Sequence, residues 1–229
     1  MAINTNKIWI VGCGPGGPEL ITREADRAVA QSKIVFGSQR LLQLFPESTA
    51  KLVTLPSRVG PALRTITEHE HGDPIAVLVS GDPGVFSLAT PIVQHFGPDR
   101  CVIVPGISSL QVAFARLGMN WSDARIISSH GRIPKVSTGE LFFEDRIAIF
   151  VGTHEAAAWV FRVALELSDT HSLIACENLS LPMEAVREID PNKVDPTEIA
   201  SLALLILVRS DMLEKFKGQE INTSMGETE

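Results

Sequence analysis

Short apolar runs that end in loops rich in glycine and proline constrain the fold of this chain more than any other feature. Residues 75–79 (Ile-Ala-Val-Leu-Val) are continuously apolar, as in a central strand of a parallel sheet, and lead into the loop 80–84 (Ser-Gly-Asp-Pro-Gly). Similar runs occur at residues 7–11, 34–36, 51–55 and 101–104. Stretches of helical periodicity separate them, so the first half predicts an open, mostly parallel α/β sheet.

Helices are expected between these runs. One follows the first glycine-rich loop, with Thr22 as its N-cap. Others are expected at residues 61–69 and 91–96, and a further helix begins at Ser109.

The second half of the chain predicts a different sheet. Strand-type runs occur at residues 124–129, 147–151, 173–176, 185–189 and 202–208, with one helix at 154–167. Closely spaced runs on both sides of residues 178–182 predict a hairpin, and therefore a mixed sheet. Residues 133–145 are expected to form a second region rich in loops.

Together these patterns predict two α/β domains with a cleft between them. We expect an N-terminal domain over residues 1–118, with the glycine loop and the loop at residues 80–84, and a C-terminal mixed-sheet domain over 119–217. Residues 218–229 contain few apolar side chains and are expected to form a disordered tail.

Charge and composition exclude several classes of protein. The 229 residues contain 20 lysines and arginines against 27 aspartates and glutamates, a net charge of −7. Proteins that bind nucleic acid usually present a basic face, so we expect no nucleic-acid partner. The N-terminal segment lacks the features of a secretory signal, and the longest apolar run is too short to span a bilayer.

The three cysteines, Cys13, Cys101 and Cys176, form no CxxC pair. We interpret them as small buried apolar residues in a reducing compartment. A cytoplasmic protein is therefore expected.

The first loop contains the spacing G-x-G-x-x-G at Gly12, Gly14 and Gly17. After a strand and before a helix, this spacing suggests a dinucleotide site. Such a site also needs an acidic residue at the end of the second strand, but residues 35–38 read Val-Phe-Gly-Ser. Pro15 and Pro18 further distort the loop, which disfavours an NAD(P)-dependent reductase; a simple tight turn is the other interpretation.

Six segments, in order along the chain, resemble the tetrapyrrole methylase family. These are S-adenosylmethionine (SAM)-dependent enzymes of the class III type, built from two α/β domains. The similar segments are residues 11–22 (VGCGPGGPELIT), 80–87 (SGDPGVFS), 105–109 (PGISS), 109–118 (SLQVAFARLG), 129–132 (SHGR) and 177–180 (ENLS). The last three are similar to the branch that methylates C5 of precorrin-7 or of its cobalt form.

The resemblance implies a SAM-dependent C-methyltransferase that acts on C5 of cobalt-precorrin-7 in cobalamin biosynthesis. It also implies a homodimer and no protein-bound metal. In some organisms a second methylase, which methylates C15 and decarboxylates a side chain, is fused to this one. This chain ends too soon to hold that partner, so we expect a separate C15 enzyme and the cobalt-containing route.

The resemblance also implies a SAM site between the domains. Its cofactor-binding residues are Pro15, Asp82, Val85, Ser108, Ser109, Thr153, Asn178 and Ala203. Asp82 is alternatively a turn aspartate that caps its own loop, and the two serines can equally be an N-cap pair. Many members of the family have a tyrosine shortly after the Gly-Asp-Pro triplet, where this chain has Phe86 and no tyrosine at all.

Methyl transfer from a sulfonium needs alignment and charge stabilisation more than a protein nucleophile. His130 is a candidate to move a proton, or else a strand-end histidine bonded to backbone. Arg132 is the best candidate to bind a carboxylate of the macrocycle. The other cationic candidates are Arg40, Arg58, Arg116 and Lys135.

The run His69-Glu70-His71 suggests a metal site but is interpreted as a solvated turn. Three further functions stay open. One is a ribosomal RNA or protein methylase of the same fold, the second is the reductase, and the third is a non-catalytic subunit that binds the macrocycle.

Overall fold

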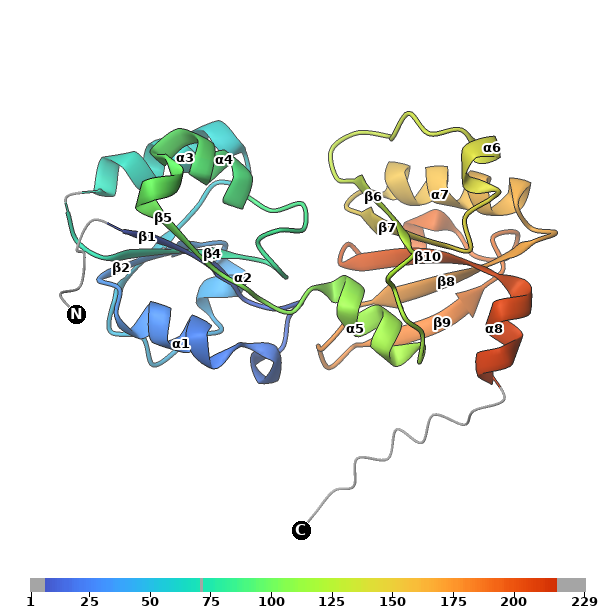
Figure 1. Ribbon diagram of the computed structural model, residues 1–229, viewed down its shortest axis with the longest axis horizontal. Helices are drawn as coiled ribbons and strands as arrows, with labels where there is room; N and C mark the ends of the chain where they lie inside the picture. Colours follow the sequence, from blue (N-terminus) through green and yellow to red (C-terminus); the bar gives the residue numbers. More distant parts are fainter. Residues whose placement is uncertain (1–6, 71, 218–229) are drawn as a thin grey trace, which may run out of the picture. The chain divides into compact units, whose positions relative to one another are not determined.

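The computed structural model describes residues 7–70 and 72–217. The chain divides into two compact units, one ending at Ser109 and the other beginning at Leu110 (Figure 1). Helix α5 (Ser109–Arg116) is thereby grouped with the second unit, in which its last residue forms an ion pair. The domain boundary predicted from the sequence, near Gly118, lies after α5 and would have placed this helix in the first unit. The expected tail at residues 218–229 lies outside the described residues, and the expected cleft stays a prediction.

The first unit contains one parallel sheet with the strand order β3-β2-β4-β1-β5. Its strands are β1 (Ile8–Gly12), β2 (Ile34–Gly37), β3 (Lys51–Thr54), β4 (Ile75–Val79) and β5 (Cys101–Val104). All the strand pairs are parallel, which confirms the expectation from the alternating runs. Because β1 lies between β4 and β5, the loops that follow these three strands emerge as neighbours at one edge.

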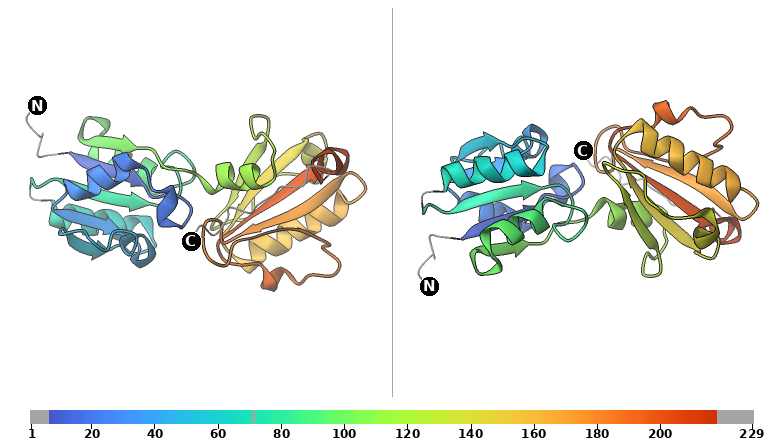
Figure 2. Two further views of the ribbon diagram at one scale, coloured as in Figure 1. Left: turned by 90° about the horizontal axis from the view of Figure 1, so that it is seen from below. Right: turned by 90° about the horizontal axis from the view of Figure 1, so that it is seen from above.

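Helices cover both faces of this sheet (Figures 1 and 2). Their bounds are α1 (Arg23–Ala30), α2 (Gln39–Leu42), α3 (Val59–His69) and α4 (Ala89–Phe96), with short 3-10 turns η1 (Pro18–Leu20) and η2 (Pro98–Arg100). Alternate residues of β1 point to opposite faces: Ile8 and Ile10 pack with α3 and α4, and Val11 with α1 and α2. Thr22 caps α1 as predicted, since its Oγ1 accepts the Ala25 N–H at 3.1 Å.

The second unit contains a mixed sheet with the order β6-β7-β10-β8-β9. Its strands are β6 (Arg125–Ser129), β7 (Arg146–Val151), β8 (His171–Glu177), β9 (Ala185–Ile189) and β10 (Ala203–Arg209). Only β6 and β7 pair in parallel, and the β7–β10, β10–β8 and β8–β9 pairs are antiparallel. The mixed sheet and the β8–β9 hairpin are thus confirmed.

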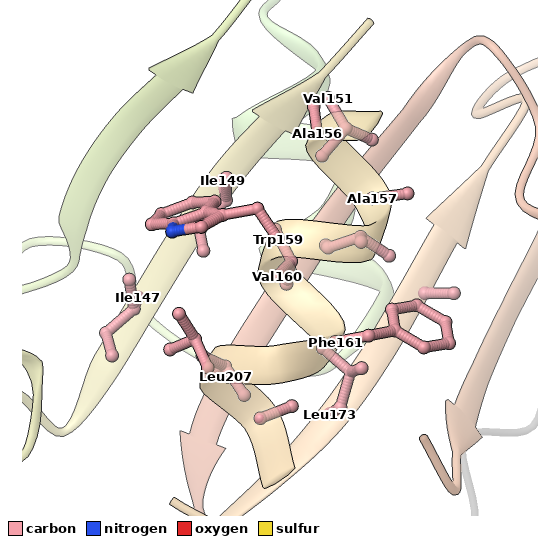
Figure 3. Close-up of a cluster of buried hydrophobic side chains, with 14 of the residues drawn as sticks. Ile147, Ile149, Val151, Ala156, Ala157, Trp159, Val160, Phe161, Leu173 and Leu207 are labelled. Atoms are coloured by element: carbon pink, nitrogen blue, oxygen red, sulfur yellow. The ribbon is translucent and has the colours of Figure 1, made fainter. Parts of the chain in front are cut away.

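Helix α7 (His154–Glu166) forms the core on one face of this sheet (Figure 3). The buried cluster on this face contains Trp159, Val160 and Phe161 of α7, of which Val160 is fully buried. It also includes Ile149 of β7 and Leu207 of β10. Burial of each large side chain contributes about 1.5–3 kcal/mol to folding. Helices α5 and α8 (Ser210–Lys217) lie on the opposite side of the sheet (Figures 1 and 2).

The region expected to be loop-rich contains a short helix, α6 (Thr138–Leu141). Ser137 and Glu140 form a capping box at its start, and Leu141 is buried in the α7 core. A 3-10 turn, η3 (Pro196–Glu198), precedes β10.

The cysteines only partly match their predicted burial. Cys13 and Cys176 are buried, and burial raises the pKa of each thiol to about 12. Cys101 is half-buried, because β5 lies at the edge of the first sheet. Over residues 7–70 and 72–217, every helix is too short or too polar to cross a membrane.

Candidate active site

The loops that follow β1, β4 and β5 are packed together with no room for side chains at two glycines. A Cβ atom on Gly12 would lie 2.6 Å from the Gly106 nitrogen and 2.7 Å from Pro83 Cδ. A Cβ atom on Gly106 would lie 2.7 Å from the carbonyl carbon of Gly12 and 2.8 Å from its Cα. Since most of these atoms are backbone and cannot move aside, only glycine permits this approach.

Backbone hydrogen bonds also join the glycine loop to the loop after β4. The Gly81 N–H donates to the Gly14 carbonyl at 2.8 Å, and the Gly14 N–H donates back to Gly81 at 3.3 Å. Both glycines are left-handed, with φ values of 67° and 70°. The Cys13 N–H donates to Val79 at 2.9 Å. These contacts support the tight-turn interpretation of the glycine spacing.

The Asp82 carboxylate links two of these loops. Its Oδ1 accepts the Gly84 N–H at 2.8 Å, and its Oδ2 accepts the Gly106 N–H at 3.2 Å. Asp82 therefore does cap its own loop, and it also holds the loop after β5. It makes no ion pair with the residues that the structure describes, so its negative charge there is balanced only by N–H dipoles.

Arg40 of α2 lies at the same edge of the first sheet. Its Nη2 donates to Ser80 Oγ at 3.0 Å, and its Nη1 donates to the Pro15 carbonyl at 3.4 Å. Burial lowers the pKa of Arg40, but a guanidinium stays charged at neutral pH. This candidate for macrocycle binding thus ties the glycine loop to the loop after β4.

The other candidates of the first unit lie in the same loops. The Val85 N–H donates to the Asp82 carbonyl at 3.1 Å, so Val85 closes the turn. Phe86 follows with a left-handed φ of 47° and is 57% exposed. Ser108 is buried and directly precedes Ser109, the first residue of α5.

The second sheet also gathers its candidates at one edge. Ser129 at the end of β6 pairs with Val151 of β7. Ala203, which begins β10, pairs with both Val151 and Glu177. The ends of β6, β7 and β8 therefore lie beside the start of β10. Four candidates are brought to this edge: His130, Thr153, Asn178 and Ala203.

His130 packs on a glycine. A Cβ atom on Gly152 would lie 2.7 Å from His130 Cδ2, and the His130 ring centroid lies 6.5 Å from that of Phe150. Burial lowers the pKa of His130, so the imidazole is neutral at pH 7 and can accept a proton. Arg132, two residues further on, is exposed, and its carbonyl accepts a weak bond from Ser129 Oγ at 3.5 Å.

Thr153 is the N-cap of α7, where its Oγ1 accepts the Ala156 N–H at 3.1 Å. It also lines a pocket of about 260 Å³ within the second unit, together with His154, Ile199 and Ser201. The pocket lies beside the start of β10, so a ligand there would meet Thr153 and the chain just before Ala203.

The loop after β8 is strained. Asn178 and Ser180 have left-handed φ values of 50° and 61°. Such a conformation costs a residue such as Ser180 about 1 kcal/mol or more, and it costs an asparagine less. Asn178 is anchored by its N–H, which donates to Leu202 at 2.9 Å.

The remaining cationic candidates differ in their surroundings. Arg116 is bound to Glu184, with Nε at 2.5 Å from Oε1 and Nη2 at 3.4 Å from Oε2. Arg58 and Lys135 are exposed.

His69 and Glu70 have partners unrelated to a metal. His69 Nδ1 lies 2.9 Å from the Thr65 carbonyl, and Glu70 pairs with Arg100. His71 is outside the described residues. No group of three potential metal ligands is found within residues 7–70 and 72–217.

Sequence reasoning missed three residues at these edges. Gly152 makes room for His130, Glu184 supports the strained loop, and Glu177 joins β8 to Arg187 and to the Ala200 N–H at 2.8 Å. Gly152 follows a predicted strand and was recognisable by that position. Although Glu184 is four residues from Ser180 and Glu177 lies in the segment 177–180, their contacts with Arg116 and Ala200 span 68 and 23 residues of sequence and leave no local signal.

Comparison with known proteins shows the family to which the chain belongs. The family model for tetrapyrrole (corrin/porphyrin) methylases matches residues 7–190. The cobalt-precorrin-7 C(5)-methyltransferase of Salmonella typhimurium is 30% identical over 189 residues, which cover 82% of this chain and 92% of that protein.

Two solved structures share the fold. The precorrin-6Y methylase of Archaeoglobus fulgidus matches with a TM-score of 0.71 and 25% identity, over 89% of this chain and 98% of that one. The uroporphyrin-III C-methyl transferase of Thermus thermophilus, complexed with S-adenyl homocysteine, matches with a TM-score of 0.71 and 23% identity, over 88% and 97%. With its two sheets, its strand-end loops and this family match, the chain belongs to the tetrapyrrole (corrin/porphyrin) methylases.

Proposed function

We propose that this protein is a SAM-dependent C-methyltransferase that adds a methyl group to C5 of cobalt-precorrin-7 in the biosynthesis of cobalamin (vitamin B12). The likeness to the Salmonella enzyme, which extends over 92% of that protein, supports the substrate. The observation that carries the proposal is the gathering of the candidate loops. In each unit they lie at one edge of the sheet, where open α/β sheets bind ligands.

The residues present fit a cationic cofactor. Asp82 has two N–H donors but no ion pair in the described part of the chain. A carboxylate in that state favours a positively charged ligand. Pro15, Val85, Ser108 and Ser109 would complete this side of the cofactor site, and Thr153, Asn178 and Ala203 would form the part in the second unit.

The cofactor supplies a methyl group on a sulfonium, which already carries its own leaving group. The chain therefore needs to orient the reacting carbon and to exclude water, and needs no protein nucleophile. His130 would accept the proton released when the methylated carbon rearranges its double bonds, because its lowered pKa keeps the ring neutral. Arg132 would bind a carboxylate of the macrocycle.

The same proposal includes a homodimer in the cytoplasm. It also includes a separate enzyme for methylation at C15 and for decarboxylation, and no metal bound by the protein itself. Any cobalt would be part of the substrate.

The first test is turnover. Purified protein is incubated with SAM and cobalt-precorrin-7, and the product mass and the methylated position are determined. We expect the gain of one methyl group at C5, absent without SAM. No product from folded protein that still binds S-adenosylhomocysteine would favour the metal-free substrate or another macrocycle. Folded protein that neither methylates nor binds S-adenosylhomocysteine would favour the non-catalytic subunit.

The second test is cofactor binding. Asp82→Ala should weaken S-adenosylhomocysteine binding about tenfold in a calorimetric titration, since it removes a charge and releases two loop N–H groups. Asp82→Asn keeps one acceptor oxygen and should lose less affinity for S-adenosylhomocysteine. Unchanged affinity in Asp82→Ala would remove Asp82 from the site.

A further inference from the structure

The loop after β8 needs support from elsewhere in the second unit. Asn178 and Ser180 are both left-handed, and Leu179 between them is 5% exposed. Residues other than glycine persist in this conformation only where the surrounding structure fixes them. The loop therefore depends on the contacts that hold it.

Glu184 makes the central contact. Its Oε2 accepts the Ser180 N–H at 2.5 Å, while its Oε1 accepts from Arg116 Nε at 2.5 Å. The Glu184 backbone also closes the loop, because its N–H donates to the Leu181 carbonyl at 2.8 Å. One side chain thus joins the strained loop to the last residue of α5.

The charge on Glu184 strengthens this contact. The hydrogen bond from Arg116 lowers the pKa of Glu184, and the Ser180 N–H lowers it further. The carboxylate is therefore ionised at neutral pH, and hydrogen bonds to an ionised acceptor are about twice as strong as neutral ones.

We propose that Glu184, oriented by Arg116, is a positioning residue that fixes the backbone of Asn178 and Ser180 for cofactor binding. This inference rests on the proposed function, in which Asn178 is a cofactor contact. The loop lies at the candidate edge, since the Asn178 N–H is bonded to Leu202, next to Ala203.

Stabilisation of the fold is a weaker explanation for the pair. The side chains of Arg116 and Glu184 are 45% and 23% exposed. Ion pairs at such exposure contribute little to stability. A role in loop geometry predicts that binding is lost while the fold is kept.

The experiment compares Glu184→Ala and Glu184→Gln with wild type and with Asp145→Asn. Asp145 forms an ion pair with Arg209 at 3.2 Å, near the start of β7 and away from the candidate edge, and the two side chains are 54% and 31% exposed. Calorimetry gives the dissociation constant for S-adenosylhomocysteine, chemical denaturation gives the stability, and hydrogen exchange gives the protection of the Ser180 amide.

We expect Glu184→Ala to weaken binding about tenfold and to lose Ser180 protection, with a nearly unchanged denaturation midpoint. Glu184→Gln keeps an acceptor oxygen, so its affinity for S-adenosylhomocysteine should fall only about threefold. The affinity of Asp145→Asn should stay within about twofold of wild type. A swapped pair, Arg116→Glu with Glu184→Arg, restores an ion pair but no acceptor for the Ser180 N–H. It should not rescue binding.

Wild-type affinity in Glu184→Ala, or full rescue by the swapped pair, would overturn the inference and leave the proposed function intact. A wild-type protein that binds no S-adenosylhomocysteine would instead contradict the proposed function. Loss of Ser180 protection in Glu184→Ala would then still show that Glu184 positions the loop.

Discussion

The two units shape their strand-end loops by opposite means. In the first unit, Gly12 and Gly106 bring backbone against backbone because neither has a side chain. In the second unit, Asn178 and Ser180 adopt a left-handed backbone that the Glu184 carboxylate supports. Loops built from glycine are fixed by local sterics, whereas the strained loop depends on charged partners. We therefore expect substitutions at Gly12 and Gly106 to affect folding, and substitutions at Asn178 and Ser180 to affect mainly the loop.

The largest effect is expected for Gly106→Ala. Its Cβ atom would collide with the backbone of Gly12 and Gly81, so the free energy of unfolding should fall by about 3 kcal/mol or more. Gly139→Ala is the matched control, because a Cβ atom there meets nothing within 4 Å. Because Gly139 lies in helix α6, Gly139→Ala should raise the free energy of unfolding by about 0.5–1 kcal/mol. Similar denaturation curves for the two variants would refute the steric argument.

A smaller loss is expected for Glu177→Ala. This buried carboxylate accepts the Ala200 N–H at 2.8 Å and pairs with Arg187 at 3.1 Å. Its removal leaves a donor unsatisfied and should lower the free energy of unfolding by about 2 kcal/mol. Arg187→Met should cost less, since Arg187 is 43% exposed. A larger loss in the arginine variant would contradict the order of these contributions.

Strain in the second unit can be measured at Ser180. Ser180→Gly accepts the left-handed φ of 61° and should raise the free energy of unfolding by about 0.5 kcal/mol. Ser180→Val should lower it by about 1–2 kcal/mol, because a β-branched residue is disfavoured there. Equal changes in both variants would mean that the loop stores no strain.

The smallest effect on stability is expected from protonation of His130. Because burial lowers its folded pKa, the unfolded chain binds the proton more readily, so stability falls as the pH drops through the ordinary histidine range. NMR titration should place its midpoint below that of a free histidine. Gly152→Ala, which displaces the ring, should move the midpoint back up. An ordinary midpoint in the wild type would show that the ring is not packed on Gly152.

The strands of both units were predictable from the sequence, whereas several short helices were not. Both sheet types followed from apolar runs, and β4, β5 and β9 match their predicted bounds. The three missed helices, α2, α6 and α8, are no longer than eight residues. The four residues of α2 and of α6 are too few to show a helical period, whereas α8 is as long as the predicted helices α1, α4 and α5.

Site prediction divides in the same way. Asp82 and Ser108 were recognisable because they follow predicted strands, and the structure places them together with the glycine loops. Glu184 was not recognisable, because its partner Arg116 is 68 residues away in sequence. Arg40 was one of several cationic candidates for substrate binding, and its contacts with Pro15 and Ser80 arise only from tertiary structure.

The buried thiols give each unit its own chemical reporter. Cys13 lies in the first unit and Cys176 in the second, and a thiol with a pKa of about 12 reacts with alkylating reagents only when its surroundings open. With Cys101 replaced by alanine, the alkylation rate at each position would report opening of one unit separately. Mass spectrometry of the two labelled peptides would then show which unit opens first.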